Sequence, residues 1–382
     1  MVNLLIKILI DGCIFSSYPH GGIARYFREI LKRITFNNKN INFYVMCDEQ
    51  SHEHLPEHPQ IQPIFFRSLA FRPSLIFHYL DDWRQRRFNQ AIVDLSPHVF
   101  HSTYYTLPPF SGMKTVTTVY DLIDHQFPLM HPNGFGFVER QRKVLNTADR
   151  VISISRSTTD LAIKAFGINP LKIETVVLGA NEKFIPANEY EKTLFRNRFT
   201  NGQPYFLFVG AMGGYKNLTT VIRAFAQVVE KSGHLLVLAG HSMQSIEPWI
   251  IDLAIQCRVE EKIIVLHHPR DEVLATAYSA ASAFIFPSLL EGFGIPLLEA
   301  MQCDCKVIAS DIPVFREVCE NAALYFDPHN ASELAGAMLN VLASDDGDHA
   351  RTFRQSRLSH FSWDVAAKKI ENIYLELAGQ AA

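Results

Sequence analysis

The sequence lacks several features that would place a protein in a class at once. No run of residues approaches the roughly 18 consecutive apolar residues that a membrane-spanning helix needs. The 36 basic and 39 acidic residues leave a formal net charge of −3, which gives no support to nucleic-acid binding. Six cysteines among 382 residues are too few for a disulfide framework. We therefore expect a soluble, cytoplasmic protein whose cysteines are free thiols.

Metal-binding patterns are equally scarce. Cys303 and Cys305 are separated by one residue, and no second cysteine pair follows at zinc spacing. His267 and His268 are adjacent on a predicted strand, so their side chains point to opposite faces. The Asp-Gly-Asp at residues 346–348 imitates a metal-binding motif, but it lies in a polar loop predicted between two helices, which favours solvated acids. We expect no metal site.

What the sequence does contain is an alternation of strand and helix patterns that occurs twice. Val2–Ile10 is apolar but short and contains Lys7, which favours a first strand over a signal peptide. A chain of 382 residues is too long for one core, and the repeated alternation predicts an α/β protein with two doubly wound, parallel-sheet domains that meet near residues 182–200. The predicted strands are Leu4–Ile10, Ile41–Cys47, Ile61–Phe66, Val99–Ser102, Lys114–Val119, Arg150–Ile154 and Ile173–Val177, then Tyr205–Val209, Leu235–Leu238, Ile263–Leu266, Ala283–Phe286, Lys306–Ala309 and Leu324–Phe326.

Helices are predicted from apolar residues at helical spacing and from capping patterns. Ser157, with Asp160 three residues later, predicts the start of a helix that runs to Phe166. One helix presents Ile23, Phe27, Ile30, Leu31 and Ile34 on a single face, and others are predicted over Gly136–Ala148, Ala331–Leu342 and Asp364–Leu377.

The most informative stretch runs from Ser288 to Met301, between a strand and a helix. Gly292 and Gly294 allow positive φ and a close approach of a ligand to the backbone. Pro296 suits the first turn of a helix. The turn therefore directs free backbone N–H groups and the positive end of a helix dipole to one point, an arrangement that binds phosphate.

Two glutamates flank this turn. Glu291 precedes the helix and Glu299 lies one turn inside it, and carboxylates so placed can accept hydrogen bonds from pairs of sugar hydroxyls. The alternative is an ordinary strand-turn-helix with two solvated glutamates. The Gly-Phe-Gly-Ile-Pro between them favours a sugar-nucleotide site.

Two further glycine-rich turns precede predicted helices. Lys216 ends the loop that begins at Gly210, and a cation at the start of a helix opposes the helix dipole unless an anion binds there. A solvated lysine is the alternative. Gly21 and Gly22 follow the first strand, where a plain turn is the alternative to a phosphate-approaching loop.

Polar residues also follow the strands of the first domain. The carboxyl ends of parallel strands face the ligand crevice, so His101, Asp121 and His125 are candidates for contact with an acceptor or for proton transfer. For a lone histidine, a structural role is the commoner alternative.

The stretch Pro-Ser-x-x-Glu-Gly-Phe-Gly-x-Pro-x-x-Glu-Ala, residues 287–300, resembles the signature of the family 4 glycosyltransferases. The resemblance covers most of the chain and is strongest from Tyr205 to Pro328. It implies the GT-B fold and metal-independent transfer of a hexose from a nucleotide sugar to a hydroxyl acceptor, with retention of configuration. The nucleotide sugar is then a substrate, and no cofactor is expected.

The resemblance also assigns roles to residues. It implies that Glu291 holds the transferred sugar, that Glu299 holds the ribose, and that Lys216 helps the diphosphate to leave. The implied catalytic residues are Glu291, Lys216, Asp121 and His101, and the implied donor site consists of Gly21, Gly22, Ala211, Met212, Lys216, His268, Arg270, Glu291, Gly292, Phe293, Gly294, Ile295 and Glu299.

The chain departs from the family pattern at several positions. Many members have His-Asp where this chain has Tyr120-Asp121, which leaves Asp121 as the stronger candidate. Ala211 and Tyr215 stand where an arginine is common, so Lys216 has fewer cationic partners. Asp304 replaces a frequent glycine, and Asp tolerates left-handed backbone better than most residues.

By resemblance, residues 1–185 form the acceptor-side domain, residues 186–363 bind the donor, and the helix of residues 364–382 returns to the first domain, with the ligand between the two.

We expect UDP-glucose or a similar UDP-hexose as the donor, with GDP-mannose second, and a glycan or lipid-linked glycan as the acceptor in polysaccharide assembly. A GT-B epimerase and a non-catalytic nucleotide-sugar-binding partner are the alternatives.

The segment 65–88 is both basic and aromatic. It is interpreted first as a domain helix with a charged outer face, and second as peripheral contact with the inner face of a membrane. Its charged residues are Arg67, Arg72, Asp81, Asp82, Arg84, Arg86 and Arg87.

Overall fold

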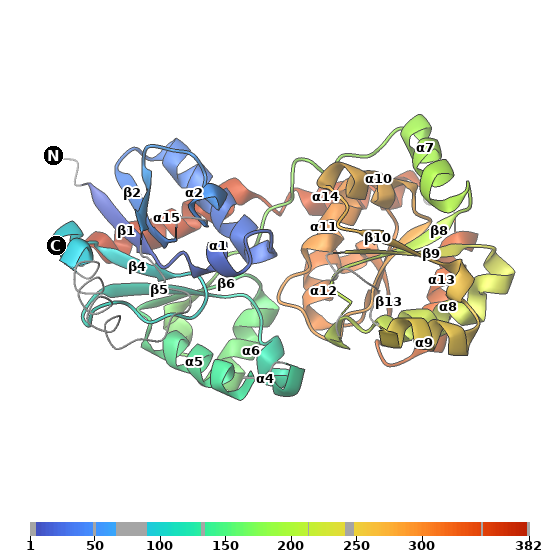
Figure 1. Ribbon diagram of the computed structural model, residues 1–382, viewed down its shortest axis with the longest axis horizontal. Coiled ribbons are helices and arrows are strands. Elements are labelled where there is room, and N and C mark those ends of the chain that lie inside the picture. The colour runs from blue at the N-terminus through green and yellow to red at the C-terminus, as the bar shows by residue number, and fades with distance from the viewer. Residues whose placement is uncertain are drawn as a thin grey trace, which may run out of the picture. The chain divides into compact units, whose positions relative to one another are not determined.

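The computed structural model divides into two compact units, each with one sheet (Figure 1). It describes residues 5–48, 51–65, 90–130, 134–212, 214–240, 248–344 and 347–379. Unit 1 comprises Met1–His125, Asn133–Gly179 and Ser362–Ala382, and unit 2 comprises Gln126–Pro132 and Ala180–Phe361.

Unit 1 contains a seven-stranded sheet in the order β3-β2-β1-β4-β5-β6-β7. All its neighbouring strands are parallel. The strands are β1 Ile6–Ile10, β2 Ile41–Cys47, β3 Ile61–Phe65, β4 Val99–Ser102, β5 Lys114–Val119, β6 Arg150–Ser153 and β7 Ile173–Thr175. Its helices are α1 Cys13–Ser17, α2 Gly22–Asn37, α4 Ile123–Gln126, α5 Gly134–Thr147, α6 Arg156–Phe166 and α15 Trp363–Gly379.

The C-terminal helix α15 packs against α2, β1 and β4, and Figure 1 shows it in red among the blue elements of unit 1. Tyr374 of α15 is fully buried, with its ring centroid 6.0 Å from that of Phe43. On α2, Phe27, Ile30 and Leu31 are buried as their helical spacing predicts, because one apolar face has to be removed from water.

Unit 2 contains a six-stranded parallel sheet in the order β10-β9-β8-β11-β12-β13. The strands are β8 Tyr205–Val209, β9 Leu235–Gly240, β10 Ile263–His267, β11 Ala283–Phe286, β12 Val307–Ser310 and β13 Ala323–Phe326. The helices are α7 Glu189–Thr200, α8 Leu218–Ser232, α9 Pro248–Cys257, α10 Asp271–Ala280, α11 Ile295–Gln302, α12 Pro313–Cys319, α13 Ala331–Ala343 and α14 Asp348–Leu358.

The strands of unit 2 are buried on both faces. Every residue of β8, β9, β11 and β12 is buried, which is why these segments read as continuous apolar runs rather than as alternating patterns. Helices α8 and α13 pack against each other, and residues of both belong to the apolar core of the unit. A rigid sheet of this kind fixes the positions of the turns at its carboxyl edge.

Two predictions about helices are wrong. The cap of α6 is Ser155 rather than Ser157, and the Ser155 hydroxyl accepts the Thr158 N–H at 3.0 Å. The helix α14 was not predicted, and it begins at Asp348, where a loop of solvated acids was expected.

Helix α14 is held by the turn that precedes β12. Asp304 has a φ of 56°, so the left-handed turn predicted for it is confirmed. Its carboxylate pairs with Arg351 and with the buried Arg354, each at 2.7 Å. An aspartate at this position thus supplies an anchor for α14 that a glycine would lack.

Among the described residues, no helix is long and apolar enough to cross a membrane. The segment 65–88, for which a charged helix or a membrane contact was predicted, lies outside the described residues apart from Phe65.

Candidate active site

Both sheets have a topological switch point at the same place in their strand order. In unit 1 it lies between β1 and β4, and in unit 2 between the corresponding strands β8 and β11. In open α/β sheets, ligands bind outside the carboxyl ends of the strands at this point, because the connections diverge there. The residues that follow these four strands are therefore the first candidates for a site.

In unit 2, side-chain hydrogen bonds of Asn217 connect the turns that follow β8 and β11. Its side-chain amide donates to the carbonyl oxygens of Pro287 at 3.1 Å and Pro328 at 2.7 Å. The residue has a φ of 56° directly before α8, a conformation that Asn adopts more readily than most residues. Leu289 N–H also donates to the Tyr215 carbonyl at 2.8 Å. The glycine loop and the Glu291 turn thus form one structural element.

Backbone packing beside this turn requires glycine. A Cβ on Gly240, at the end of β9, would lie 2.1 Å from the Gly210 carbonyl oxygen, so any side chain there would displace the loop. This close approach keeps the loop from Gly210 to Asn217 at the sheet edge.

The structure brings together two residues that were predicted from separate motifs. The Lys216 ammonium lies 2.5 Å from Oε1 of Glu291. The Ser288 hydroxyl donates to the same oxygen at 2.7 Å. The side chains of Lys216 and Glu291 are only 12% and 11% exposed. The ammonium also lies 5.1 Å and 5.2 Å from the ring centroids of Tyr215 and Phe286, so aromatic faces stabilise its charge.

Helix α11 begins next to this pair. Gly294 precedes it with a φ of 103°, and Pro296 occupies its first turn, both as predicted. The expectation of positive φ at Gly292 is wrong, since that glycine is not among the described residues with positive φ. A Cβ on Gly294 would lie 3.0 Å from Leu297 and 3.2 Å from Phe315. Glycine is therefore favoured here both by the positive φ and by the close packing of these side chains.

Glu299 lies on the buried side of α11. Glu299 is 6% exposed, and the Tyr278 hydroxyl donates a hydrogen bond to its Oε2 at 3.4 Å. Burial, together with the Glu299 charge, raises the pKa of Tyr278 well above its usual value, so that this hydroxyl remains a donor. Neither glutamate of the motif is the solvated surface residue that the alternative interpretation required.

The remaining predicted donor residues differ in exposure. Ala211, His268 and Arg270 are exposed, whereas Met212 is 3% exposed. His268 and Arg270 follow the carboxyl end of β10. Phe293 is buried and its ring contacts that of Phe361. Gly21 and Gly22 belong to unit 1, where they begin α2.

The switch point of unit 1 is organised by Asp11, a residue that sequence reasoning did not select. Asp11 follows β1 and is 5% exposed. It accepts hydrogen bonds from the Ser102 hydroxyl at 3.2 Å, from the Thr103 N–H at 3.0 Å, and from the hydroxyls of Thr103 and Thr106. Burial and the charge of Asp11 raise the pKa of the Cys13 thiol to about 12. This carboxylate is enclosed by donors of its own unit.

The expectation that His101 faces a ligand is wrong. The side chain is fully buried, and its Nδ1 lies 2.6 Å from the Tyr374 hydroxyl while Nε2 lies 3.0 Å from the Thr118 hydroxyl. Burial lowers its pKa to about 3, so the imidazole is neutral. His101 therefore joins α15 to the sheet and has no free nitrogen for proton transfer.

Asp121 remains near the surface of unit 1. It is half-buried, and its Oδ1 accepts the Ile123 N–H at 3.0 Å. Tyr120, which precedes it, is 5% exposed and donates its hydroxyl to the Thr103 carbonyl at 3.1 Å. The Asp121 charge helps burial to raise the pKa of Tyr104. His125 is exposed and stacks edge-on against Phe166.

Aromatic rings gather around Tyr104, the tyrosine whose pKa the Asp121 charge helps to raise. The centroid of Tyr104 lies 6.4 Å from that of Tyr18 and 5.3 Å from that of Phe137. Tyr18 is 60% exposed. This aromatic cluster therefore has one well exposed ring, that of Tyr18.

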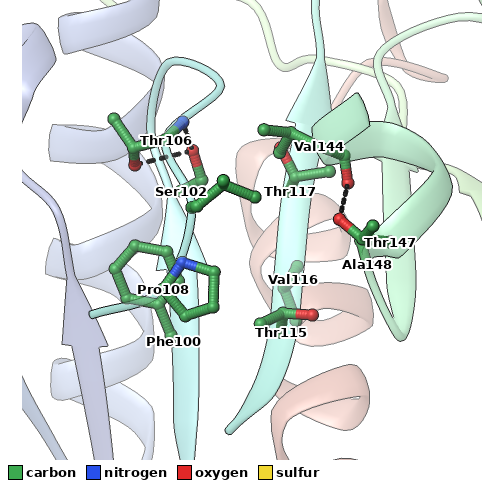
Figure 2. A pocket seen from close by; sticks show the side chains of 11 residues that line it. Phe100, Ser102, Thr106, Pro108, Thr115, Val116, Thr117, Val144, Thr147 and Ala148 are labelled. Atoms are coloured by element: carbon green, nitrogen blue, oxygen red, sulfur yellow. Dashed lines mark hydrogen bonds between the residues drawn. The ribbon is translucent and has the colours of Figure 1, made fainter. Parts of the chain in front are cut away.

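A small cavity lies elsewhere in unit 1, between β4, β5 and α5 (Figure 2). Thr117 lines it, and the hydroxyl of this residue has no hydrogen-bond partner among the described residues. The cavity has room for about one water molecule. It is thus far too small for a nucleotide sugar.

Sequence reasoning missed three residues that the structure connects to these turns, namely Asp11, Asn217 and Ser288. Asp11 and Ser288 lie within two residues of a strand end, the position that already pointed to Asp121, whereas Asn217 directly precedes α8. Among the described residues, no group of three or more histidine, cysteine, aspartate or glutamate side chains could hold a metal ion.

Two family models match the chain. The model described as "Glycosyltransferase Family 4" matches residues 20–183, and the model described as "Glycosyl transferases group 1" matches residues 189–357. O-antigen chain mannosyltransferase B of Escherichia coli is 26% identical over 373 residues, which cover 94% of this chain and 96% of that protein. O-antigen chain mannosyltransferase RfbU of Salmonella typhimurium is 30% identical over 243 residues, 63% of this chain and 64% of that protein.

Solved structures show the same fold. Sucrose-phosphate synthase from Thermosynechococcus elongatus superposes with a TM-score of 0.78 at 20% identity, covering 98% of this chain and all of that one. HepE of Anabaena, solved in complex with UDP and glucose, gives a TM-score of 0.73 at 15% identity over 97% of this chain and all of that one. With its two halves matched by glycosyltransferase models and its fold matched over nearly its whole length, the chain belongs to glycosyltransferase family 4 and has the GT-B fold.

Proposed function

We propose that this protein transfers a hexose from a nucleotide sugar to a hydroxyl group of a growing glycan, with retention of anomeric configuration. The observation that carries the proposal is the Lys216–Glu291 pair at the switch point of unit 2, directly before α11. A cation, a carboxylate and the amino end of a helix at one place suit a ligand that carries both phosphate and sugar hydroxyls.

The proposed roles follow from the charges. Lys216 and the backbone amides of residues 292–295 stabilise the negative charge that develops on the departing diphosphate. Glu291 accepts hydrogen bonds from the transferred sugar, and Glu299 accepts them from the ribose. A front-face route, in which the leaving phosphate oxygen takes the acceptor proton, requires no separate base in unit 2.

The sugar is proposed from the relatives. The full-length relative and the Salmonella relative are both named as mannosyltransferases of O-antigen chains. These names favour mannose, and hence GDP-mannose, over the UDP-glucose that the sequence alone placed first. They also favour polysaccharide assembly as the setting.

We propose that the acceptor is a glycan or a lipid-linked glycan that binds beside Asp121. Sugars present one face of C–H groups, which packs on aromatic rings such as Tyr104 and Tyr18, while a carboxylate accepts their hydroxyls. Asp121, whose charge helps to raise the pKa of Tyr104, is the proposed residue for contact with the attacking hydroxyl.

The test is a turnover assay with a panel of nucleotide sugars, including GDP-mannose and UDP-glucose, with and without mannose-containing oligosaccharide acceptors. The proposal expects a glycosylated product by mass spectrometry only when donor and acceptor are both present. Conversion of donor without acceptor into an epimeric nucleotide sugar would identify an epimerase instead. Tight donor binding in calorimetry without any turnover would identify a non-catalytic binding partner.

A further inference from the structure

We infer that Ser288 is a positioning residue that keeps Glu291 in its catalytic orientation when Lys216 binds the donor diphosphate. The inference rests on the proposed function, because it takes Glu291 as the group that holds the transferred sugar. Ser288 is not itself expected to touch either substrate.

The location of Ser288 gives its hydroxyl little freedom. The residue is fully buried and follows β11 by two positions. The preceding Pro287 carbonyl is held by the Asn217 side chain at 3.1 Å, and the following Leu289 N–H is held by the Tyr215 carbonyl at 2.8 Å. The backbone on both sides of Ser288 is therefore fixed, and its hydroxyl has a defined direction.

Two donors share one oxygen of Glu291. The Lys216 ammonium lies 2.5 Å from Oε1, and the Ser288 hydroxyl lies 2.7 Å from the same atom. Neither bond uses Oε2, which leaves that oxygen for a sugar hydroxyl. The two donors differ in what they can do next, because lysine is a flexible point charge on a long stem, whereas the serine hydroxyl is short and buried.

A diphosphate carries more negative charge than one carboxylate, so it competes with Glu291 for Lys216. When the ammonium turns to the phosphates, Glu291 loses its charge-assisted bond. Ser288 then remains as a donor to Oε1 and prevents the carboxylate from rotating. Before the donor binds, in contrast, Lys216 by itself suffices to hold Glu291.

This difference predicts a separation of kinetic constants. Ser288→Ala should leave the fold and the Michaelis constant of the donor nearly unchanged, because Lys216 still holds Glu291 in the free enzyme. It should lower kcat by about ten- to hundredfold, the range expected when a hydrogen bond to a charged group is lost in the transition state. Ser288→Thr, which retains the hydroxyl, should recover most of kcat.

The chain offers a matched control in Ser310. This residue ends the neighbouring strand β12, is fully buried, and its hydroxyl has no hydrogen-bond partner among the described residues. Ser310→Ala therefore removes a buried strand-end hydroxyl without removing such a bond, and kcat should stay at the wild-type value.

The experiment measures kcat and the donor Michaelis constant for the full chain and these variants, with the donor and acceptor that give the highest turnover. Equal kcat for Ser288→Ala and Ser310→Ala beside an active wild type would overturn the role of Ser288 while leaving the proposed function intact. An inactive wild type with every donor would overturn the proposed function, and the inference with it. If Ser288→Ala does not fold, the Ser288→Thr and Ser288→Val variants, which are isosteric with each other, are compared instead. The kcat of Ser288→Thr should then exceed that of Ser288→Val by about ten- to hundredfold, and equal kcat values would overturn the role of Ser288.

Discussion

The two sheets place a carboxylate at the same point in their topology and surround it differently. In unit 1, Asp11 follows β1 and binds Ser102, which ends β4, and Thr103, which follows it. In unit 2, Lys216 follows β8 and binds Glu291, which follows β11. Asp11 is buried and its partners are hydroxyl and amide groups, whereas Glu291 is only partly buried and its partners include a cation.

This difference indicates which switch point can exchange its partners for a ligand. Uncharged donors fixed on the same unit have no better acceptor than Asp11, so that cluster stabilises the fold. An ammonium can leave one anion for another of higher charge, so the Lys216–Glu291 pair can open when a diphosphate arrives. We therefore propose that one switch point serves structure and that the other serves chemistry.

The largest expected effect is that of Lys216→Ala. If the lysine stabilises the departing diphosphate, its interaction is stronger in the transition state than in the ground state. We expect kcat to fall by roughly a hundredfold or more, with a smaller rise in the donor Michaelis constant. Steady-state kinetics with the preferred donor measures both constants.

Two variants control this experiment. Lys216→Arg should restore little activity, because a planar fork does not replace a point charge in a tight glycine turn. Lys231→Ala, in the last turn of α8, should leave kcat unchanged. Full turnover by Lys216→Ala would contradict the proposal that the switch point of unit 2 is catalytic and that of unit 1 is structural.

Asp11→Ala should act on stability. It leaves the buried hydroxyls of Ser102 and Thr103, and the half-buried hydroxyl of Thr106, without their shared acceptor. We expect the free energy of unfolding to fall by about 3 kcal/mol, since each unsatisfied buried donor costs about 1–3 kcal/mol. Urea unfolding followed by circular dichroism measures the change. Unfolding at wild-type denaturant concentration, together with lost nucleotide binding, would assign Asp11 to a ligand instead.

A somewhat smaller effect is expected from His101, and it depends on pH. Its pKa is about 3 in the folded protein against an ordinary 6.5, so the unfolded chain binds a proton below pH 6.5 that the folded protein does not. Stability is therefore lost as the pH falls from about 6.5 towards 3. Between about pH 7.5 and about pH 5, this residue should cost about 2 kcal/mol.

Urea unfolding of the wild type and of His101→Gln at both pH values isolates the contribution of His101 to the free energy of unfolding. The variant has no imidazole to titrate, so its stability should fall less between the two pH values than that of the wild type. An equal fall in both proteins would show that His101 is protonated in the folded state.

Chelation should have the smallest effect. Lys216 and the amides before α11 are proposed to hold the diphosphate without a metal, so activity should be unchanged in excess EDTA. The assay compares initial rates before and after treatment. Activity that disappears in chelator and returns with magnesium or manganese would show that unit 2 needs a cation besides Lys216.

Most of the fold could be predicted because buried parallel strands leave a plain signal. The strands Ile41–Cys47, Lys114–Val119, Tyr205–Val209 and Ala283–Phe286 were predicted with the bounds that the structure has. Each is a short apolar or β-branched run between turn residues. The roles of Gly294 and Pro296 could also be predicted, because the backbone conformations they permit are intrinsic to those residue types.

The predictions failed where tertiary contacts decide. Helix α14 is polar along its length, and its attachment depends on Asp304, which is distant in the sequence. Ser155 and Ser157 are both residues that can cap a helix, and in the structure Ser155 does so. His101 occupies a strand end, as a site residue would, but α15 covers it with Tyr374.

Hydrogen exchange with and without a nucleoside diphosphate tests the central claim most directly, because it reports each unit separately. We predict that UDP or GDP slows exchange of the backbone amides in residues 210–217 and 292–297 of unit 2. Residues 101–106, enclosed around Asp11 in unit 1, should exchange at the same rate with and without nucleotide. Protection confined to unit 1, with the Lys216 and Glu291 turns unchanged, would contradict the account.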